Sequence, residues 1–167
     1  MKILAGSSAL SAFRISKILS VCHEKSIPVI NLEAQFVHFI DSISEFTVEQ
    51  QLTLDKLLQY GPKSVHIDKD CNTNKQLFLV TPRAGTISPW SSKATDIAHN
   101  CGLTQIHRIE RGIAYYVVTS SPLTQPQQDK FAELIHDRMM ETVLTSFDQA
   151  EQLFKVDEPA PVTVVDL

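Results

Sequence analysis

The sequence predicts an α+β fold made of two β-α-ββ-α halves that pack about a pseudo-two-fold axis. Stretches with a hydrophobic period of two alternate with helical stretches, and the same order occurs twice. Capping boxes begin at Thr47 and at Thr124, which are 77 residues apart, and Glu33 and Glu110 are separated by the same interval. Two landmarks of different kinds with one spacing indicate an internal duplication. Chance agreement between two loosely defined patterns is the alternative.

The first half contains a strand, a helix, a strand or strand pair, and a second helix. The period is helical after Ser7 or Ser8, either of which can cap the first helix, and it becomes two after Pro28. The second helix starts at Thr47 and stops at Gly61-Pro62. The predicted elements are residues 1–4, 8–25, 30–39 and 47–61.

The second half repeats this order. A strand at residues 77–80 precedes a helix at 91–100, which Gly102 ends, and a strand pair at 104–119 follows. The last helix starts at Thr124. Its predicted apolar row consists of Phe131, Ile135, Met139 and Val143.

Composition places the boundaries of these units. Polar residues at 62–76 connect two halves, about 1–62 and 76–145, so residues 1–145 form one predicted domain. Residues 146–167 include a proline-containing extended stretch and are predicted to begin a linker to a further domain.

Charge and cysteine content exclude several classes of protein. The 167 residues carry a formal net charge of −4 and contain no Lys/Arg block, so we expect no nucleic-acid partner. The longest apolar run, Ile113–Val118, is far shorter than the ~20 residues that span a bilayer. Cys22, Cys71 and Cys101 are odd in number and widely spaced, which indicates reduced thiols of a cytoplasmic protein. The oligomeric state stays open.

Residues 81–103 differ most from ordinary scaffold. They combine two prolines, the only tryptophan, several hydroxyl residues and two cations in a loop that runs into a helix. Such a stiff, polar segment is typical of a contact site, and we expect it to be largely exposed. Its candidate interface or anion-contact residues are Arg83, Thr86, Ser88, Trp90, Ser91, Ser92 and Lys93.

Lys93 is the most informative residue of this segment. Backbone N–H groups at a helix start attract anions, yet the first turn here carries Lys93 in place of an acidic residue. A cation there costs roughly 0.3 to 1 kcal/mol, which a bound phosphate or a partner's carboxylate would offset. The alternative is a serine-capped helix with Lys93 in water and Trp90 in the core.

Other residues on the same predicted helix carry weaker signals. Asp96 and His99 lie three residues apart, but no further ligand stands at metal spacing, which favours a solvated or hydrogen-bonded histidine. Cys101 lacks the glycine pattern of a nucleophile elbow, which favours a structural thiol.

Charged residues also alternate in the second strand pair. Arg108, Glu110 and Arg111 precede Gly112, and this pattern favours a solvated hairpin face over a catalytic set. No glycine-rich phosphate loop, nucleotide fingerprint or pair of catalytic carboxylates occurs in the sequence. We therefore predict no catalytic residue and no metal site.

Seven segments carry a more specific signal. They are SALSAFRI at 8–15, VHF at 37–39, YGP at 60–62, TPRAGTISPWSSKATDIAHNCG at 81–102, ERGIAYY at 110–116, HDRMMET at 136–142 and PVT at 161–163. These segments resemble the N-terminal region of phosphoribosylformylglycinamidine synthase, the large single-chain, glutamine-dependent enzyme of purine biosynthesis. The resemblance extends along nearly the whole chain, and the run at 81–102 alone would be hard to reach by chance.

The resemblance implies a fold and a role. That N-terminal region is similar to two copies of the small separate subunit with which some bacteria hold the synthetase and the glutaminase together. An intrachain dimer of this kind agrees with the 77-residue interval. The chain is therefore expected to be an assembly module that contacts the synthetase and glutaminase domains of its parent.

The resemblance also implies which chemistry is missing from the chain. The parent, a glutamine amidotransferase and carbon–nitrogen ligase, converts formylglycinamide ribonucleotide, glutamine and ATP to formylglycinamidine ribonucleotide, glutamate, ADP and phosphate. Its ATP, magnesium and catalytic residues belong to later domains, so this chain alone is expected to hold no cofactor and to be inactive. The alternative is an autonomous phosphate-ester binding protein or small enzyme that uses residues 81–103.

Overall fold

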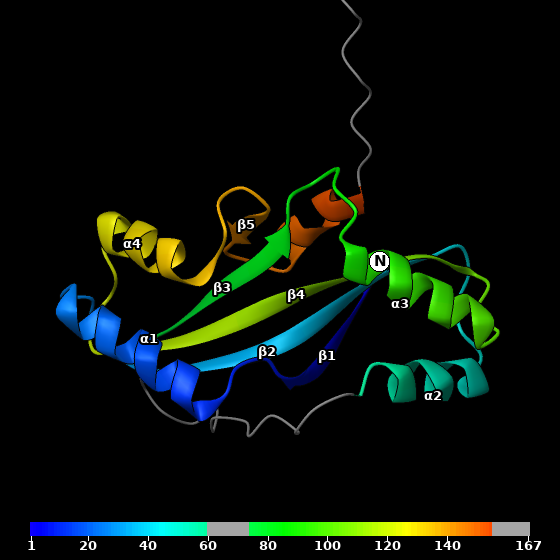
Figure 1. Ribbon diagram of the computed structural model, residues 1–167, viewed down its shortest axis with the longest axis horizontal. Helices are drawn as coiled ribbons and strands as arrows, with labels where there is room; N and C mark the ends of the chain where they lie inside the picture. Colours follow the sequence, from blue (N-terminus) through cyan, green and yellow to red (C-terminus); the bar gives the residue numbers. More distant parts are fainter. Residues whose placement is uncertain (60–73, 155–167) are drawn as a thin grey trace, which may run out of the picture.

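The computed structural model describes residues 1–59 and 74–154 (Figure 1). Strands and helices alternate along the chain as far as the last α-helix. In order, the elements are β1 (Lys2–Ser8), α1 (Ala12–Glu24), β2 (Val29–Ser42), α2 (Val48–Leu57), β3 (Asn74–Pro82), α3 (Pro89–Asn100), β4 (Ile106–Thr119), α4 (Gln125–Ile135), β5 (Glu141–Leu144) and the 3-10 helix η1 (Asp148–Phe154). They form the predicted α+β fold around one antiparallel sheet in the order β1-β2-β4-β3-β5.

The four α-helices cover one face of the sheet, and η1 covers part of the other. In β2, Ala34 packs in a cluster with Phe131 of α4, whereas Val37 packs in a cluster with Leu153 of η1. Neighbouring positions of a strand point to opposite faces, so the two clusters lie on opposite sides of the sheet. Ile40, on the same face as Ala34, packs against α2 and α3. Figure 1 shows α1 and α4 at one end of the sheet and α2 and α3 at the other, so this face carries two apolar cores.

Helices α2 and α4 start where the capping boxes predict. The backbone N–H of Thr47 donates to the side chain of Gln50 at 2.9 Å, and that of Thr124 donates to the side chain of Gln127 at 3.0 Å. The N–H of Gln50 donates in return to the hydroxyl of Thr47 at 3.3 Å. These bonds satisfy N–H groups that a helix start leaves without a backbone partner.

The strand pairs of the predicted β-α-ββ-α halves do not form: in the first half the single-strand alternative is correct, and in the second half the predicted pair at 104–119 is wrong, because β4 is also one long strand. β2 and β4 contain 14 residues each. They pair from Val29 opposite Thr119 to Ser42 opposite Ile106, and the ladder is interrupted only by irregularities near its ends. Apolar residues occupy both faces of β2 because η1 covers the second face, and a second strand is not needed to bury them.

Several helix bounds also differ from the prediction. α2 ends at Leu57, before the predicted stop at Gly61-Pro62, and α3 begins at Pro89, two residues earlier than predicted. Ser11 is the N-cap of α1, in place of an earlier serine, because β1 extends through Ser8. α4 ends at Ile135, and Met139 is 85% exposed. Residues after this turn form β5, which pairs with the end of β3 and contains Val143. Apolar residues at intervals of four also occur where a helix is followed by a turn and a short strand, so the spacing alone did not locate the end of α4.

Several remaining predictions concern the membrane, the thiols and the connections. No helix in the described part of the chain is long and apolar enough to cross a membrane. Cys22 is a buried free thiol and Cys101 an exposed one. Cys71, most of the predicted connection at 62–76 and the predicted linker after Phe154 lie outside the described residues.

Candidate functional site

Residues 83–87 form an exposed loop between β3 and α3. Gly85 has a φ of +80°, which glycine adopts without the steric cost that a side chain imposes. The N–H and the hydroxyl of Thr86 both donate to the carbonyl of Arg83, at 3.2 and 2.6 Å, and close the turn. The loop therefore holds Ile87, which is 65% exposed, outside the core.

Arg83 joins this loop to the turn that precedes β5. Its backbone N–H donates to the carbonyl of Met140 at 3.1 Å, and its guanidinium donates to the carbonyl of Arg138. Met139 and Met140 are both exposed. We call the continuous area formed by residues 83–87 and 138–140 the loop surface. Its exposed large apolar side chains are Ile87, Met139 and Met140.

Ser88 and Ser91 fix the start of α3 on β4. The hydroxyl of Ser88 accepts the N–H of Ser91 at 3.0 Å and donates to Oε1 of Glu110 at 2.7 Å. The buried hydroxyl of Ser91 donates to the carbonyl of Ile109 at 2.5 Å. Both hydroxyls are thus engaged within the protein and hold the helix in place.

Glu110 is fully buried, so the prediction of a solvated face is wrong for this residue. Its carboxylate accepts the Ser88 hydroxyl and, at 2.5 Å, the guanidinium of Arg108. Arg108, whose side chain is 13% exposed, also donates to the carbonyls of Thr86 at 2.6 Å and Leu153 at 3.1 Å. Pairing and hydrogen bonds offset the cost of burying both charges. This ion pair connects β4 with the loop surface and with η1.

Arg111 lies on the opposite face of β4, among the α-helices. Its guanidinium carbon is 4.5 Å from the centre of the Phe36 ring and 4.7 Å from that of Trp90. The half-buried Trp90 ring is also 5.8 Å from the ring of His38. Burial, together with the positive charge of Arg111, lowers the pKa of His38 to about 4. The imidazole is therefore neutral at pH 7.

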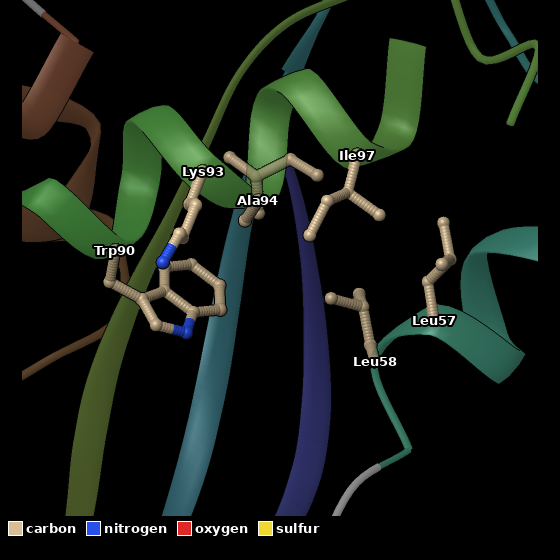
Figure 2. A pocket seen from close by; sticks show the side chains of 7 residues that line it. Leu57, Leu58, Trp90, Lys93, Ala94 and Ile97 are labelled. Carbon is tan, nitrogen blue, oxygen red and sulfur yellow. The ribbon is translucent and has the colours of Figure 1, made fainter. Parts of the chain in front are cut away.

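A cleft of about 220 Å³ separates α2 from α3 (Figure 2). Leu57 and Leu58 of α2 face Ile97 of α3 across it, and Trp90 closes one end. Lys93 is the one charged residue among the described residues that line the cleft, and Figure 2 shows its side chain extending toward Trp90. This cleft combines an apolar lining with a single cation.

The structure divides the predicted site residues into two groups. The expectation of a largely exposed segment is confirmed for residues 83–87 and for Ser92 and Lys93. Ser88 and Ser91 instead point into the protein, and Trp90 is half-buried between the cleft and Arg111. The exposed members are Arg83, Thr86, Ser92 and Lys93, and the inward members are Ser88, Trp90 and Ser91.

The sequence interpretation assigned the three charged residues of β4 to a solvated face and missed the contacts that they make. Arg108 and Glu110 are two positions apart, so a single long strand places them on one face, and Arg111 falls on the other. The signal that could have revealed them is the apolar character of the surrounding positions, since charges within such a strand must find partners.

The weaker candidates have ordinary structural partners. Nε2 of His99 is 2.6 Å from the carbonyl of Ile106, to which it can only donate. Cys101 is the C-cap of α3 and precedes Gly102, which has a φ of +87°. Within residues 1–59 and 74–154, no group of three or more His, Cys, Asp or Glu side chains could hold a metal ion.

A comparison with known protein families shows to which family the chain belongs. The model of a family described as formylglycinamide ribonucleotide amidotransferase N-terminal matches residues 35–154, which is more than two thirds of the chain. The chain belongs to this family. The matched range includes the loop surface, α3 and all of β4, so the residues described above belong to the amidotransferase N-terminal unit itself. The family match confirms the resemblance to phosphoribosylformylglycinamidine synthase, which is the same enzyme under another name.

Proposed function

We propose that this chain is the docking module of a formylglycinamide ribonucleotide amidotransferase. It positions the synthetase and glutaminase domains and performs no chemistry alone. Family membership supports a role within this enzyme. In this proposal ATP, magnesium and the conversion of formylglycinamide ribonucleotide belong to domains outside the 167 residues.

The observation that carries the proposal is a buried ion pair that supports an exposed loop. Burying Glu110 and Arg108 is costly, and the guanidinium uses one of its bonds to hold the carbonyl of Thr86. Ile87 is therefore presented in a fixed position. An exposed apolar surface that is already ordered loses little conformational entropy when a partner covers it.

The same arginine also supports the end of the described chain. Arg108 donates to the carbonyl of Leu153, and its guanidinium carbon lies 5.4 Å from the centre of the ring of Phe154. The loop surface thus lies beside η1, the last described element. This placement suits a module that contacts the polypeptide following it.

The cleft between α2 and α3 supports the same role. Its apolar lining suits an apolar side chain of a partner, and Lys93 at the rim suits a neighbouring carboxylate. Because α3 begins at Pro89, Lys93 lies beyond its first turn, so the prediction of a cation at the helix start is wrong and the expected cost from the helix dipole does not apply.

The proposal includes an internal duplication, with two halves related by an axis through the middle of β2 and β4. In an antiparallel pair, equivalent residues stand opposite each other only at such an axis. Phe36 pairs with Ile113, and these residues are 77 apart. The N-caps keep the same interval, from Ser11 to Ser88 and from Thr47 to Thr124. Superposition of the two halves should place Thr47 on Thr124, and any other correspondence would contradict the duplication.

The alternative of an autonomous phosphate-ester binding protein has less support. The hydroxyls of Ser88 and Ser91 and the guanidinium of Arg83 already make bonds within the protein. A phosphate would have to break those bonds, which brace α3 and the loop surface.

The division into a domain at 1–145 and a linker from residue 146 stays a proposal, in which η1 packs back on the sheet.

The docking function is tested with the enzyme divided into two polypeptides, this chain and the remainder. We expect the remainder alone to lose glutamine-dependent amidine formation and to regain it when this chain is added. Ile87→Asp should weaken the recovery. The control is Ile30→Asp, which changes another exposed isoleucine, near the start of β2, and should leave the recovery unchanged. Turnover by this chain alone that survives repurification would contradict the proposal.

A further inference from the structure

The middle of the helix-covered face contains a second cavity, of about 160 Å³, that docking through the loop surface does not use. Its floor includes Phe36 and Ile113, which pair across β2 and β4. Trp90 from the first turn of α3 and Glu141 from β5 form parts of its wall. The space corresponds to about five water molecules, or to the end of one side chain.

Arg111 is the cation of this cavity. The rings of Phe36 and Trp90, 4.5 and 4.7 Å from its guanidinium carbon, hold the group by cation–π contacts. A guanidinium donates its N–H groups only in its own plane. Rings that fix this plane therefore also fix the directions in which the N–H groups can bind. The fixed fork of an arginine matches the two oxygens of a carboxylate.

The charges around the cavity favour an anion. Ser88 and Trp90 line it, so the positive end of the α3 dipole, about half an elementary charge, borders the same space. The first turn of α3 contains no acidic residue. His38, which contacts Trp90, is neutral at pH 7. The opposing charge is Glu141, whose Oε1 accepts the backbone N–H of Asp137 at 3.0 Å.

We propose that this cavity is a socket for one aspartate or glutamate side chain of the polypeptide on which the module docks, and that Arg111 binds the carboxylate. The inference rests on the docking function proposed above and adds the chemistry of one contacting group. Glu141 lowers the affinity for any free anion. A free carboxylate compound should therefore bind weakly but saturably, and attachment to a docked polypeptide raises the concentration of the carboxylate at the cavity and so its occupancy.

Trp90 is the only tryptophan of the chain, so its fluorescence reports on the socket. The 167-residue chain is titrated with N-acetyl-aspartate N-methylamide, with the corresponding lysine compound and with inorganic phosphate. We expect a saturable change with the aspartate compound and none with the lysine compound. Saturation by the lysine compound would overturn the proposal, as would tighter binding of phosphate than of the aspartate compound.

Two substitutions should shift this affinity in opposite directions. Arg111→Leu should weaken binding of the aspartate compound by about tenfold to a hundredfold, because a charge-assisted hydrogen bond is lost. Glu141→Gln should strengthen binding, because it removes the negative charge that repels the carboxylate. The amide oxygen can still accept the N–H of Asp137, so the turn before β5 is kept. If Arg111→Leu does not fold, Arg111→Lys, which keeps the charge without the planar fork, should bind more weakly than wild type. Unchanged affinity in the arginine variants would overturn the proposal.

Association with the remainder of the enzyme separates this inference from the docking function. If wild type and Arg111→Leu bind the remainder equally tightly, the socket is wrong and docking stands. If wild type itself fails to bind, docking is wrong, and the fluorescence titration still decides whether Arg111 binds a carboxylate. Weaker association of the folded Arg111→Leu chain, with wild type binding tightly, supports both.

Discussion

The guanidinium of Arg108 lies 2.5 Å from the carboxylate of Glu110, two residues further along β4 on the same face of the sheet. Side chains two positions apart in a strand are neighbours, so the strand itself brings the two charges together. Each member also reaches beyond the strand, Glu110 to the cap of α3 and Arg108 to the loop surface and η1. Loss of either charge should therefore affect stability more than loss of an exposed ion pair.

Glu110→Gln should lower the free energy of unfolding by about 3 to 5 kcal/mol, because it leaves the charge of Arg108 buried without its partner. Urea unfolding followed by Trp90 fluorescence measures the change. The matched control is Glu133→Gln, which removes the exposed pair with Arg138 and should cost about 1 kcal/mol or less. Equal effects of the two substitutions would show that the buried pair does not brace the domain.

Thr81→Val should raise the free energy of unfolding by about 1 kcal/mol. The hydroxyl of Thr81 is fully buried and has no hydrogen-bond partner, so a methyl group of similar size removes an unpaired polar atom. Thr95→Val should have the opposite effect, because the Thr95 hydroxyl accepts the N–H of Ile109 at 3.1 Å. Chemical denaturation of both variants provides the comparison. Destabilisation by Thr81→Val would indicate a bound water at this position.

Stability should fall as the pH falls from about 6.5 to 4, and His38 should account for part of the loss. The pKa of His38 is lowered from 6.5 to about 4 in the folded chain, so the unfolded chain binds more protons in this range. Between pH 7.5 and pH 5.0 the loss from this group is about 2 kcal/mol.

Urea unfolding of His38→Gln at these two pH values checks the attribution, because this variant should lose less stability on acidification than wild type. An unchanged pH dependence in His38→Gln would assign the loss to other groups.

Lys93→Glu in the complete enzyme should lower amidine formation, or its coupling to glutamine hydrolysis, because it places a like charge against the proposed partner carboxylate. The stability of the domain should change by less than about 0.5 kcal/mol, since Lys93 is exposed. Lys17→Glu on α1 is the control for a reversed charge elsewhere on the surface.

Kinetics of the full-length variants and thermal melting of the 167-residue chain separate a contact role of Lys93 from a scaffold role. Normal coupling together with a lower melting temperature would place Lys93 in the scaffold. Trp90→Ala is a poorer probe, because Trp90 packs in the α2/α3 core and contacts Arg111.

The sequence predicted best those features that depend on local hydrogen bonds. The capping boxes at Thr47 and Thr124 gave two helix starts, because the capping side chains lie within three residues of the groups that they satisfy. Long-range partners were not predictable in this way. Glu110 resembled part of a solvated face because its partner Ser88, and η1, which covers part of this face of the sheet, are distant in sequence. The end of α4 was missed because pairing of β5 with β3 decides it.

The two carbonyls that Arg108 holds make the end of η1 and the loop surface mechanically continuous. A force applied to the chain at Phe154 acts on the carbonyl of Leu153, then on a single guanidinium, and then on Thr86. Tension in the following polypeptide and pressure on the loop surface are therefore borne by the same short set of hydrogen bonds. A displacement of η1 would therefore reach the loop surface through the side chain of Arg108, and a displacement of the loop surface would reach η1 in the same way.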